Sequence, residues 1–258
     1  MTRVIAIASG KGGVGKTTLA TNLAIALNEF GKRVIVIDCN LTTPHLSYYL
    51  GAEDFGATIN DILKGKTDIR YAVSHYNGVM FIPASLNLKD LIDIDLSNLK
   101  SHLERLDLPF IDFVFLDCAP GLGREAISVL KIADEVIFVS TPTVPTLMDV
   151  KRCIDVLRKK NKKFSLVLNM VGCGKYEFKK VEHVYELLKI PVLGSIPFDR
   201  NVVDSVAFGV PLLKMKPNSK AGVAFMKLAA NLIGIEYKVY PSPFHRIAEK
   251  IKEKLFRK

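Results

Sequence analysis

The sequence has no apolar run long enough to cross a bilayer, no cysteine pair of the CxxC type and no signal-peptide pattern at its start. A membrane-spanning helix needs ~20 predominantly apolar residues, whereas apolar stretches such as residues 136–139 are far shorter. The opening segment MTRVIAIASGKGG lacks the basic head, long apolar run and small-residue cleavage site of a leader. The scattered cysteines predict reduced thiols rather than a disulfide framework or a zinc ribbon. We therefore expect a cytoplasmic protein.

The composition is otherwise that of an ordinary globular protein with a basic excess. The 258 residues are 49% hydrophobic and 24% charged, which argues against disorder. The formal net charge is +10, and half of this excess lies in residues 238–258, where seven Lys or Arg residues accompany two Glu. A basic segment of this kind indicates an acidic surface as partner, either lipid or nucleic acid.

Short apolar runs alternate with amphipathic segments along most of the chain. The runs are nearly continuous in apolar residues, as expected of parallel strands that are covered on both faces. This alternation predicts an α/β fold, with a doubly wound, mostly parallel sheet and helices on both faces. The expected strands are residues 4–8, 34–37, 79–82, 113–116, 136–139, 166–168 and 192–195. The expected helices are residues 17–30, 97–106, 124–132, 146–160, 178–188 and 219–233.

A glycine-rich phosphate loop directly follows the first expected strand. The segment reads Gly10-Lys-Gly-Gly-Val-Gly-Lys-Thr17, which matches GxxxxGK[ST] between a strand and a helix. Glycines let backbone N–H groups converge on phosphates, and the positive end of the following helix adds to this attraction. Lys16 is expected to reach the β- and γ-phosphates, and the Thr17 hydroxyl to ligate Mg²⁺. The predicted nucleotide-binding residues of the loop are Gly10, Lys11, Gly12, Gly13, Val14, Gly15, Lys16, Thr17 and Thr18.

Lys11 adds a second lysine at the start of this loop. The stretch SGKGGVGKTT therefore resembles the deviant Walker A motif of the MinD/ParA family of P-loop ATPases, in which the early lysine reaches across a dimer to the partner's nucleotide. The resemblance implies a homodimer that forms on ATP binding, with Lys11 and Lys16 among the catalytic residues. A generic P-loop enzyme with a solvated Lys11 is the alternative.

Asp38 ends the second expected strand, where the family has its first switch. The resemblance implies that Asp38 helps to organise the water shell of the metal. Family members usually carry a second Asp two places later, which positions the attacking water, but this chain has Asn40. An amide can orient water but cannot act as a carboxylate base. We therefore expect slow hydrolysis, with Asp38 and Asn40 at the catalytic centre and residues 41–46 completing the switch.

A second carboxylate, Asp117, follows four apolar strand residues and resembles a Walker B motif. Residues 118–123, CAPGLG, come next and resemble the second switch of the family, whose backbone senses the γ-phosphate. The resemblance implies that Asp117 lies in the outer shell of Mg²⁺. The predicted metal set is therefore Thr17, Asp38 and Asp117.

Two later segments resemble the adenine-side loops of the family. Asn169 at a strand end is expected to hydrogen-bond the base edge, and the backbone near Pro197 and Asp199 to frame it. Asparagine at a strand end is also a common turn residue, so this role depends on the resemblance. The guanine signature NKxD is missing, which favours adenine. The expected cofactors are ATP and Mg²⁺.

The chain is expected to divide into a P-loop ATPase domain, residues 1–235, a linker, residues 236–243, and an amphipathic tail helix, residues 244–258. On a helix the apolar tail residues fall within an arc of about 100°. These residues are Phe244, Ile247, Ala248, Ile251 and Leu255. The pattern is typical of an interfacial helix and resembles the membrane-targeting tail of MinD-type proteins. A helix docked on its own domain and a nucleic-acid arm are the alternatives.

The leading hypothesis is an ATP-dependent switch that dimerises with ATP, binds an anionic membrane surface and is released by hydrolysis to ADP. Such a protein would lie on the inner face of the cell membrane and serve spatial regulation, such as positioning of the cell-division site, with an unidentified activator or effector protein. One alternative is a ParA-like DNA-segregation ATPase, although we expect DNA less than lipid. The other is an ATPase coupled to delivery of a metal or an iron–sulfur cluster, against which the missing CxxC counts.

Overall fold

The computed structural model describes residues 2–92, 94–106, 110–158, 162–175, 177–178 and 181–237. Within these residues the chain forms one eight-stranded sheet in the order β3-β4-β2-β5-β1-β6-β7-β8. All neighbouring strands are parallel except β3, which pairs antiparallel with β4. The strands are β1 (Arg3–Ala8), β2 (Val34–Cys39), β3 (Ser74–Tyr76), β4 (Val79–Ile82), β5 (Phe113–Cys118), β6 (Glu135–Ser140), β7 (Lys163–Val171) and β8 (Val192–Pro197).

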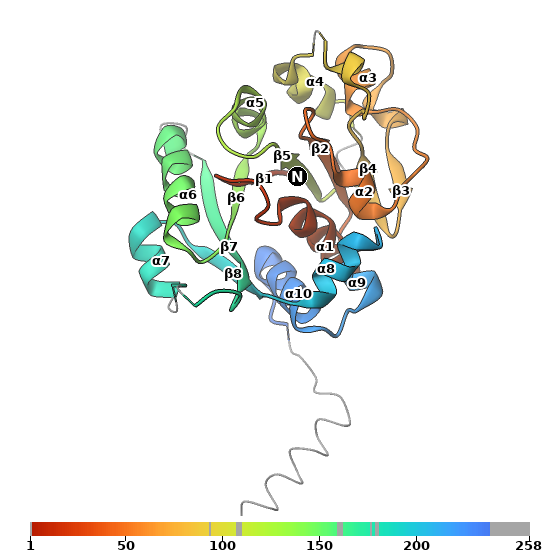
Figure 1. Ribbon diagram of the computed structural model, residues 1–258. Helices are drawn as coiled ribbons and strands as arrows, with labels where there is room; N and C mark the ends of the chain where they lie inside the picture. Colours follow the sequence, from red (N-terminus) through yellow and green to blue (C-terminus); the bar gives the residue numbers. More distant parts are fainter. Residues whose placement is uncertain are drawn as a thin grey trace, which may run out of the picture.

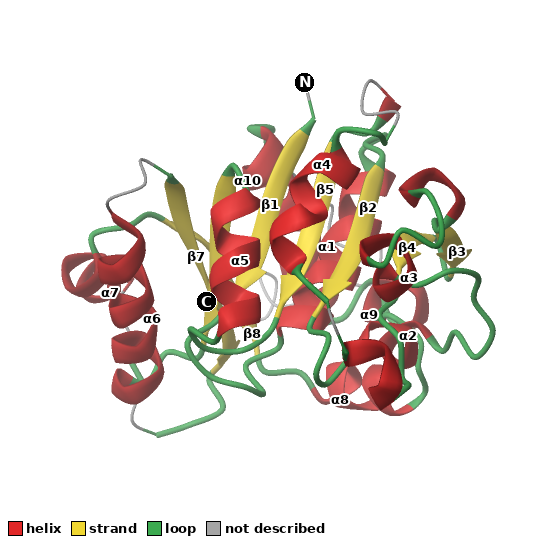
Figure 2. Cartoon of the chain, turned by 90° about the horizontal axis from the view of Figure 1, so that it is seen from above, coloured by secondary structure: helices red, strands yellow, loops and turns green. Residues whose placement is uncertain are grey.

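Helices cover both faces of this sheet (Figures 1 and 2). The α-helices are α1 (Lys16–Glu29), α2 (Leu46–Leu50), α3 (Ile59–Leu63), α4 (Leu99–Leu103), α5 (Arg124–Ile132), α6 (Val144–Leu157), α7 (Val181–Leu188), α8 (Arg200–Ala207), α9 (Leu212–Met215) and α10 (Lys220–Ile233). Three 3₁₀ turns, at Ile69–Tyr71, Leu88–Leu91 and Leu96–Asn98, lie in the connections. The prediction of a doubly wound, mostly parallel sheet with helices on both faces is confirmed.

Two hydrophobic cores lie on opposite faces of the sheet. Successive residues of a strand alternate between them: Ile5 and Ile7 pack with α1 and α10, whereas Ala6 and Ala8 pack with α5 and α6. This alternation follows from the two-residue period of a strand. The strands are continuously apolar because each face is covered, which is why their apolar runs predicted parallel strands.

The seven predicted strands are all present, and the differences concern short elements. The antiparallel edge strand β3 was not predicted, because its three residues include no apolar run. The predicted helix 97–106 was wrong in extent. Asp95 caps a 3₁₀ turn by accepting the Ser97 N–H, and only Leu99–Leu103 continues as α-helix. The predicted tail helix 244–258 and residues 238–243 of the predicted linker lie outside the described residues.

The parallel arrangement brings three functional segments to one edge of the sheet. The carboxyl ends of β1, β2 and β5 are adjacent, since Ile7 pairs with Asp117 and Asp38 pairs with Asp117. The loop from β1 to α1, the segment after β2 and the segment after β5 therefore meet there. Ligands of open α/β sheets bind at this edge.

Within the described residues, none of the helices has the length and apolar character of a membrane-spanning segment.

Candidate nucleotide-binding site

The phosphate loop joins β1 to α1, and its backbone conformation requires glycine at one position above all. Gly15, immediately before α1, has a φ of 96°, a left-handed value that glycine adopts without strain. A β-carbon on Gly15 would also collide with the side-chain amide of Asn169. The next residue, Lys16, begins α1. The predicted strand–loop–helix context of the motif is therefore present.

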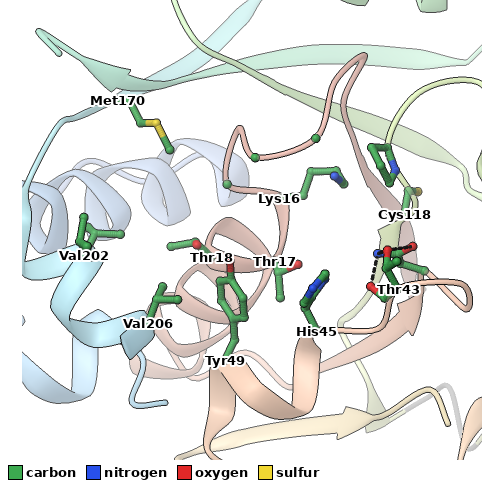
Figure 3. A pocket seen from close by; sticks show the side chains of 16 residues that line it. Lys16, Thr17, Thr18, Thr43, His45, Tyr49, Cys118, Met170, Val202 and Val206 are labelled. Carbon is green, nitrogen blue, oxygen red and sulfur yellow. Dashed lines mark hydrogen bonds between the residues drawn. The ribbon is translucent and has the colours of Figure 1, made fainter. Parts of the chain in front are cut away.

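A cavity of about 470 Å³ opens over this loop. One end is polar and is lined by Lys16, Thr17, Asn40, Thr43 and His45. The opposite end is apolar and is lined by Met170, Val202 and Val206 (Figure 3), and Val203 of the same helix also lines the cavity. A cavity with one cationic, hydroxyl-rich end and one apolar end matches a ligand with a phosphate tail and an aromatic base.

The two lysines of the loop differ in environment. The Lys16 side chain lines the cavity, and the residue is only 9% exposed. Among the described residues, no carboxylate lies within 4.0 Å of its ammonium group. A buried cation without a protein partner is costly, so this position favours an anionic ligand. Lys11, in contrast, is exposed on the loop.

Asp38 holds the segment after β2 in place. Its carboxylate is buried and accepts backbone N–H groups from Asn40 (3.0 Å), His45 (3.2 Å) and Leu46 (3.1 Å). Burial, together with the neighbouring carboxylate of Asp117, raises the pKa of Asp38 to about 7, although the three hydrogen bonds oppose this shift. Asp38 thus anchors the predicted first switch as well as facing the second carboxylate.

Asp117 and Thr17 form the part of the site that fits a divalent cation. Thr17 Oγ1 donates to Asp117 Oδ2 at 2.6 Å. The other oxygen, Oδ1, is buried and has no hydrogen-bond partner in the described part of the chain. Burial raises the pKa of Asp117 to about 6, against the opposing effects of Thr17 and Lys16. Carboxylate and hydroxyl oxygens are the ligands that Mg²⁺ prefers, and an orphaned buried oxygen needs a partner. These residues therefore fit Mg²⁺.

Asn40 lines the cavity, but its amide is engaged by the switch segment itself. Asn40 Nδ2 donates to the Thr43 carbonyl (2.5 Å) and to Thr43 Oγ1 (3.0 Å). The Thr43 hydroxyl in turn is 3.2 Å from Asn40 Oδ1. The neighbouring Thr42 hydroxyl donates to Glu125 of α5 at 2.5 Å. The predicted first switch is therefore held by hydrogen bonds within residues 40–43. One further hydrogen bond joins it to α5, the helix after the predicted second switch.

The three residues predicted on the adenine side lie at or just after the carboxyl ends of the neighbouring strands β7 and β8. Asn169 Nδ2 donates to the Val14 carbonyl at 2.8 Å, so its amide braces the phosphate loop. Pro197 pairs with Val171 at the end of β8. Asp199 caps α8 and accepts the Ala221 N–H at 3.1 Å. None of these three residues lines the cavity.

Sequence reasoning missed the apolar end of the cavity. Met170 follows Asn169 with a φ of 57°, unusual for a residue other than glycine. The other three lining residues come from α8, which is short and has no nucleotide motif. The available signal was the spacing of Val202 and Val206, which places both on one face of a helix.

Comparisons with known proteins agree with this geometry. The family model for ParA, described as a NUBPL iron-transfer P-loop NTPase, matches residues 1–233. An uncharacterized ATP-binding protein of Methanocaldococcus jannaschii is 36% identical over 239 residues, which cover 92% of this chain and 90% of the relative.

Two solved structures extend the comparison. The septum site-determining protein MinD of Pyrococcus horikoshii, solved with Mg-ADP, has a TM-score of 0.85 and 33% identity, covering 93% of this chain and 100% of that chain. MinD of Aquifex aeolicus, solved as a MinC:MinD cell division complex, has a TM-score of 0.80 and 27% identity, covering 93% and 99% of the two chains. The protein therefore belongs to the ParA family of P-loop NTPases and is MinD-like in sequence and fold.

Proposed function

We propose that this protein is a switch ATPase that binds ATP with Mg²⁺ and dimerises in that state. It then hydrolyses ATP, with one water molecule, to ADP and phosphate. The observation that carries the proposal is the polar end of the cavity. There Lys16 and Thr17 line the cavity, and Asp117 accepts from the Thr17 hydroxyl through Oδ2, while its Oδ1 has no hydrogen-bond partner in the described part of the chain. A cation and a hydroxyl on a phosphate loop, with a free carboxylate oxygen on the neighbouring strand, are what a metal-bound triphosphate requires.

Each part of the cavity has a role in this proposal. Thr17, with Asp38 and Asp117 behind it, holds Mg²⁺, which when bound stabilises negative charge on the phosphate oxygens. Lys16 neutralises the β- and γ-phosphates. The apolar end formed by Met170 and α8 receives the adenine, because a base stacks well on aliphatic side chains and a thioether. Asn169 braces the loop through its bond to the Val14 carbonyl, and its contact with the base edge stays a prediction.

Dimerisation depends on Lys11 in this proposal. The residue is exposed on the phosphate loop, so its side chain is available to the nucleotide of a second copy. Membership of the ParA family, whose deviant Walker A motif the stretch SGKGGVGKTT resembles, supports this reading. Hydrolysis is expected to be slow, since Asn40 supplies no carboxylate and its amide is engaged by Thr43.

We further propose that the ATP-bound dimer binds an anionic membrane. The chain would consist of the ATPase domain 1–235, a linker 236–243 and the amphipathic tail 244–258, which inserts at the inner face of the cell membrane. Two tails in one dimer make the second insertion intramolecular and can raise avidity by ~10²–10⁴. The output is the recruitment of a partner protein for spatial regulation, as the MinC:MinD complex of A. aeolicus suggests.

Sedimentation with vesicles tests the membrane role. Anionic vesicles should pellet the protein with a non-hydrolysable ATP analogue and Mg²⁺ much more than with ADP. Ile251→Glu, which places a charge in the apolar stripe, should abolish pelleting, whereas the matched variant Ile251→Leu should retain it. Pelleting that ignores nucleotide, or survives deletion of residues 244–258, would contradict the membrane role. A gel shift of DNA that requires ATP would favour the segregation ATPase instead.

A second candidate function is favoured by one observation. The matching family model carries an iron-transfer description, so an ATPase coupled to delivery of a metal or an iron–sulfur cluster remains an alternative. The sequence has no CxxC pair to hold such a cargo. Anaerobic reconstitution with iron and sulfide, followed by analysis of bound iron, tests this candidate. Stoichiometric iron that is lost in Cys-to-Ser variants would favour delivery over spatial regulation.

A further inference from the structure

His45 lies in the first switch and lines the nucleotide cavity. Its backbone N–H donates to Asp38 Oδ2 at 3.2 Å, and the N–H of Leu46 donates to the same oxygen at 3.1 Å. These bonds hold the residue against the carboxyl end of β2. Figure 3 shows the imidazole at the same end of the cavity as Lys16 and Thr17, away from Met170 and Val202.

Among the cavity-facing side chains of this switch, His45 is the one with an unused donor. The amide of Asn40 is engaged by Thr43, and the Thr43 hydroxyl returns to Asn40. The imidazole of His45 has no hydrogen-bond partner within the residues that the structure describes. An imidazole carries at least one N–H donor whether it is neutral or protonated. The switch therefore presents one free donor to the phosphate end of the cavity.

We propose that His45 donates a hydrogen bond to the terminal phosphate of ATP and so lets the first switch distinguish ATP from ADP. The inference depends on the nucleotide binding proposed above and adds a residue to it. The β- and γ-phosphates of a P-loop nucleotide lie at the loop lysine, which is the end where the His45 ring is found. ADP lacks the phosphate that His45 would contact, although its remaining contacts with the loop and the apolar end are the same.

Through the backbone of His45, this contact with the phosphate would also help to order residues 41–46. The side chain would contact the terminal phosphate while the N–H of the same residue is bound to Asp38. Asp38 in turn pairs in register with Asp117 of β5. Presence of the terminal phosphate would therefore hold residues 41–46 in the arrangement described here, and its loss would remove one of the contacts that order them.

Paired affinity measurements test the inference. Calorimetry with Mg²⁺ compares a non-hydrolysable ATP analogue with ADP for the wild type, His45→Ala, His45→Gln and the control His183→Ala, an exposed residue of α7. His45→Ala should weaken binding of the analogue about tenfold or more, the size of a hydrogen bond to a charged group, and leave ADP binding unchanged. His45→Gln should recover part of the loss because its amide is also a donor. His183→Ala should bind as the wild type does.

Hydrogen exchange provides a second readout that needs no turnover. In the wild type, residues 41–46 should exchange more slowly with the ATP analogue than with ADP, and His45→Ala should erase this difference. An unchanged preference for the analogue in His45→Ala, or equal weakening of both nucleotides, would overturn the role of His45. Absence of nucleotide binding to the wild type would instead overturn the proposed function itself.

Discussion

The two ends of the nucleotide cavity are built in different ways. The phosphate end consists of residues close together in sequence, Gly10–Thr17 on one loop, completed by a carboxylate at the end of each of two parallel strands. The apolar end is assembled from Met170 after β7 and from three valines of α8. Charge and hydrogen bonding dominate the first end, and shape and apolar area the second. We therefore expect the phosphate end to supply most of the affinity for a nucleotide and the apolar end to contact the base.

The largest expected effect is at the phosphate end. Lys16→Ala removes the buried cation and should weaken both ATP and ADP by about a hundredfold, since charge-assisted contacts to phosphate are strong. Lys11→Ala is the matched variant on the same loop. It should keep nucleotide binding but prevent dimerisation with a non-hydrolysable analogue, as measured by calorimetry and light scattering. Normal dimerisation of Lys11→Ala would remove the argument for a lysine that acts across a dimer.

The two buried carboxylates should make the free energy of unfolding of the ligand-free protein depend on pH. Burial raises the pKa of Asp38 to about 7 and that of Asp117 to about 6, above the ~3.9 of an unfolded chain. The folded state therefore binds more protons than the unfolded state between about pH 4 and pH 7, so the free energy of unfolding should fall as pH rises through that range. Urea unfolding at several pH values measures this trend.

Asp117→Asn is the variant that isolates the second carboxylate. Removing a buried charge with an unpartnered oxygen should raise the free energy of unfolding at about pH 8 by about 1–3 kcal/mol, while the Mg²⁺ dependence of nucleotide binding is lost. Added Mg²⁺ should stabilise the wild type and not the variant. If Asp117→Asn lowers stability in the absence of Mg²⁺, the carboxylate is not an uncompensated charge.

Asn40→Asp tests whether residue 40 of the first switch limits the rate of ATP hydrolysis. The carboxylate can act on water, and it cannot donate to the Thr43 carbonyl as the amide does. We expect hydrolysis to accelerate by about tenfold, which corresponds to about 1.4 kcal/mol of barrier. Phosphate release with and without anionic vesicles measures the rate, and Asp38→Ala should be inactive in the same assay. An Asn40→Asp protein that is no faster would show that position 40 does not act on the attacking water.

The smallest expected effect is at the apolar end. Val202→Ala removes part of the wall that faces the base and should weaken ATP by about 1 kcal/mol, the scale of a lost methylene or two. Binding of tripolyphosphate, which has no base, should not change. Competition calorimetry with both ligands separates the two ends of the cavity. Equal weakening of ATP and tripolyphosphate would break the proposed division between a phosphate end and a base end.

The fold and the phosphate loop could be predicted because their signals are local. Seven strands were identified from apolar runs, and the loop from eight consecutive residues whose chemistry does not depend on distant parts of the chain. Short elements escaped prediction for the opposite reason. Helix α2 has five residues and α9 has four, too few for a helical period to be recognised, and both are stabilised by packing against α1.

Particular residues show where sequence reasoning stopped. Asn169 is predicted to contact the base, and nothing in the sequence indicated that its amide also donates to the Val14 carbonyl, 155 positions away. The backbone near Asp199 is predicted to frame the base, and the structure adds that the Asp199 side chain caps α8 and accepts the Ala221 N–H. Each carboxylate or amide has several possible partners, and which one it meets depends on how β7, β8 and α10 pack.

The sequence by itself determined the doubly wound sheet, the phosphate loop and the identity of the two strand-end carboxylates, because strand period and glycine geometry are local properties of the chain. Only the tertiary structure decided that Asp38 and Asp117 lie in register, that Asn40 is engaged by Thr43, and that the imidazole of His45 has no hydrogen-bond partner among the described residues. It also brought Met170 beside α8. Asp38 and Asp117, like Met170 and α8, are distant in sequence, and they meet because strands and helices bury their apolar faces against one another.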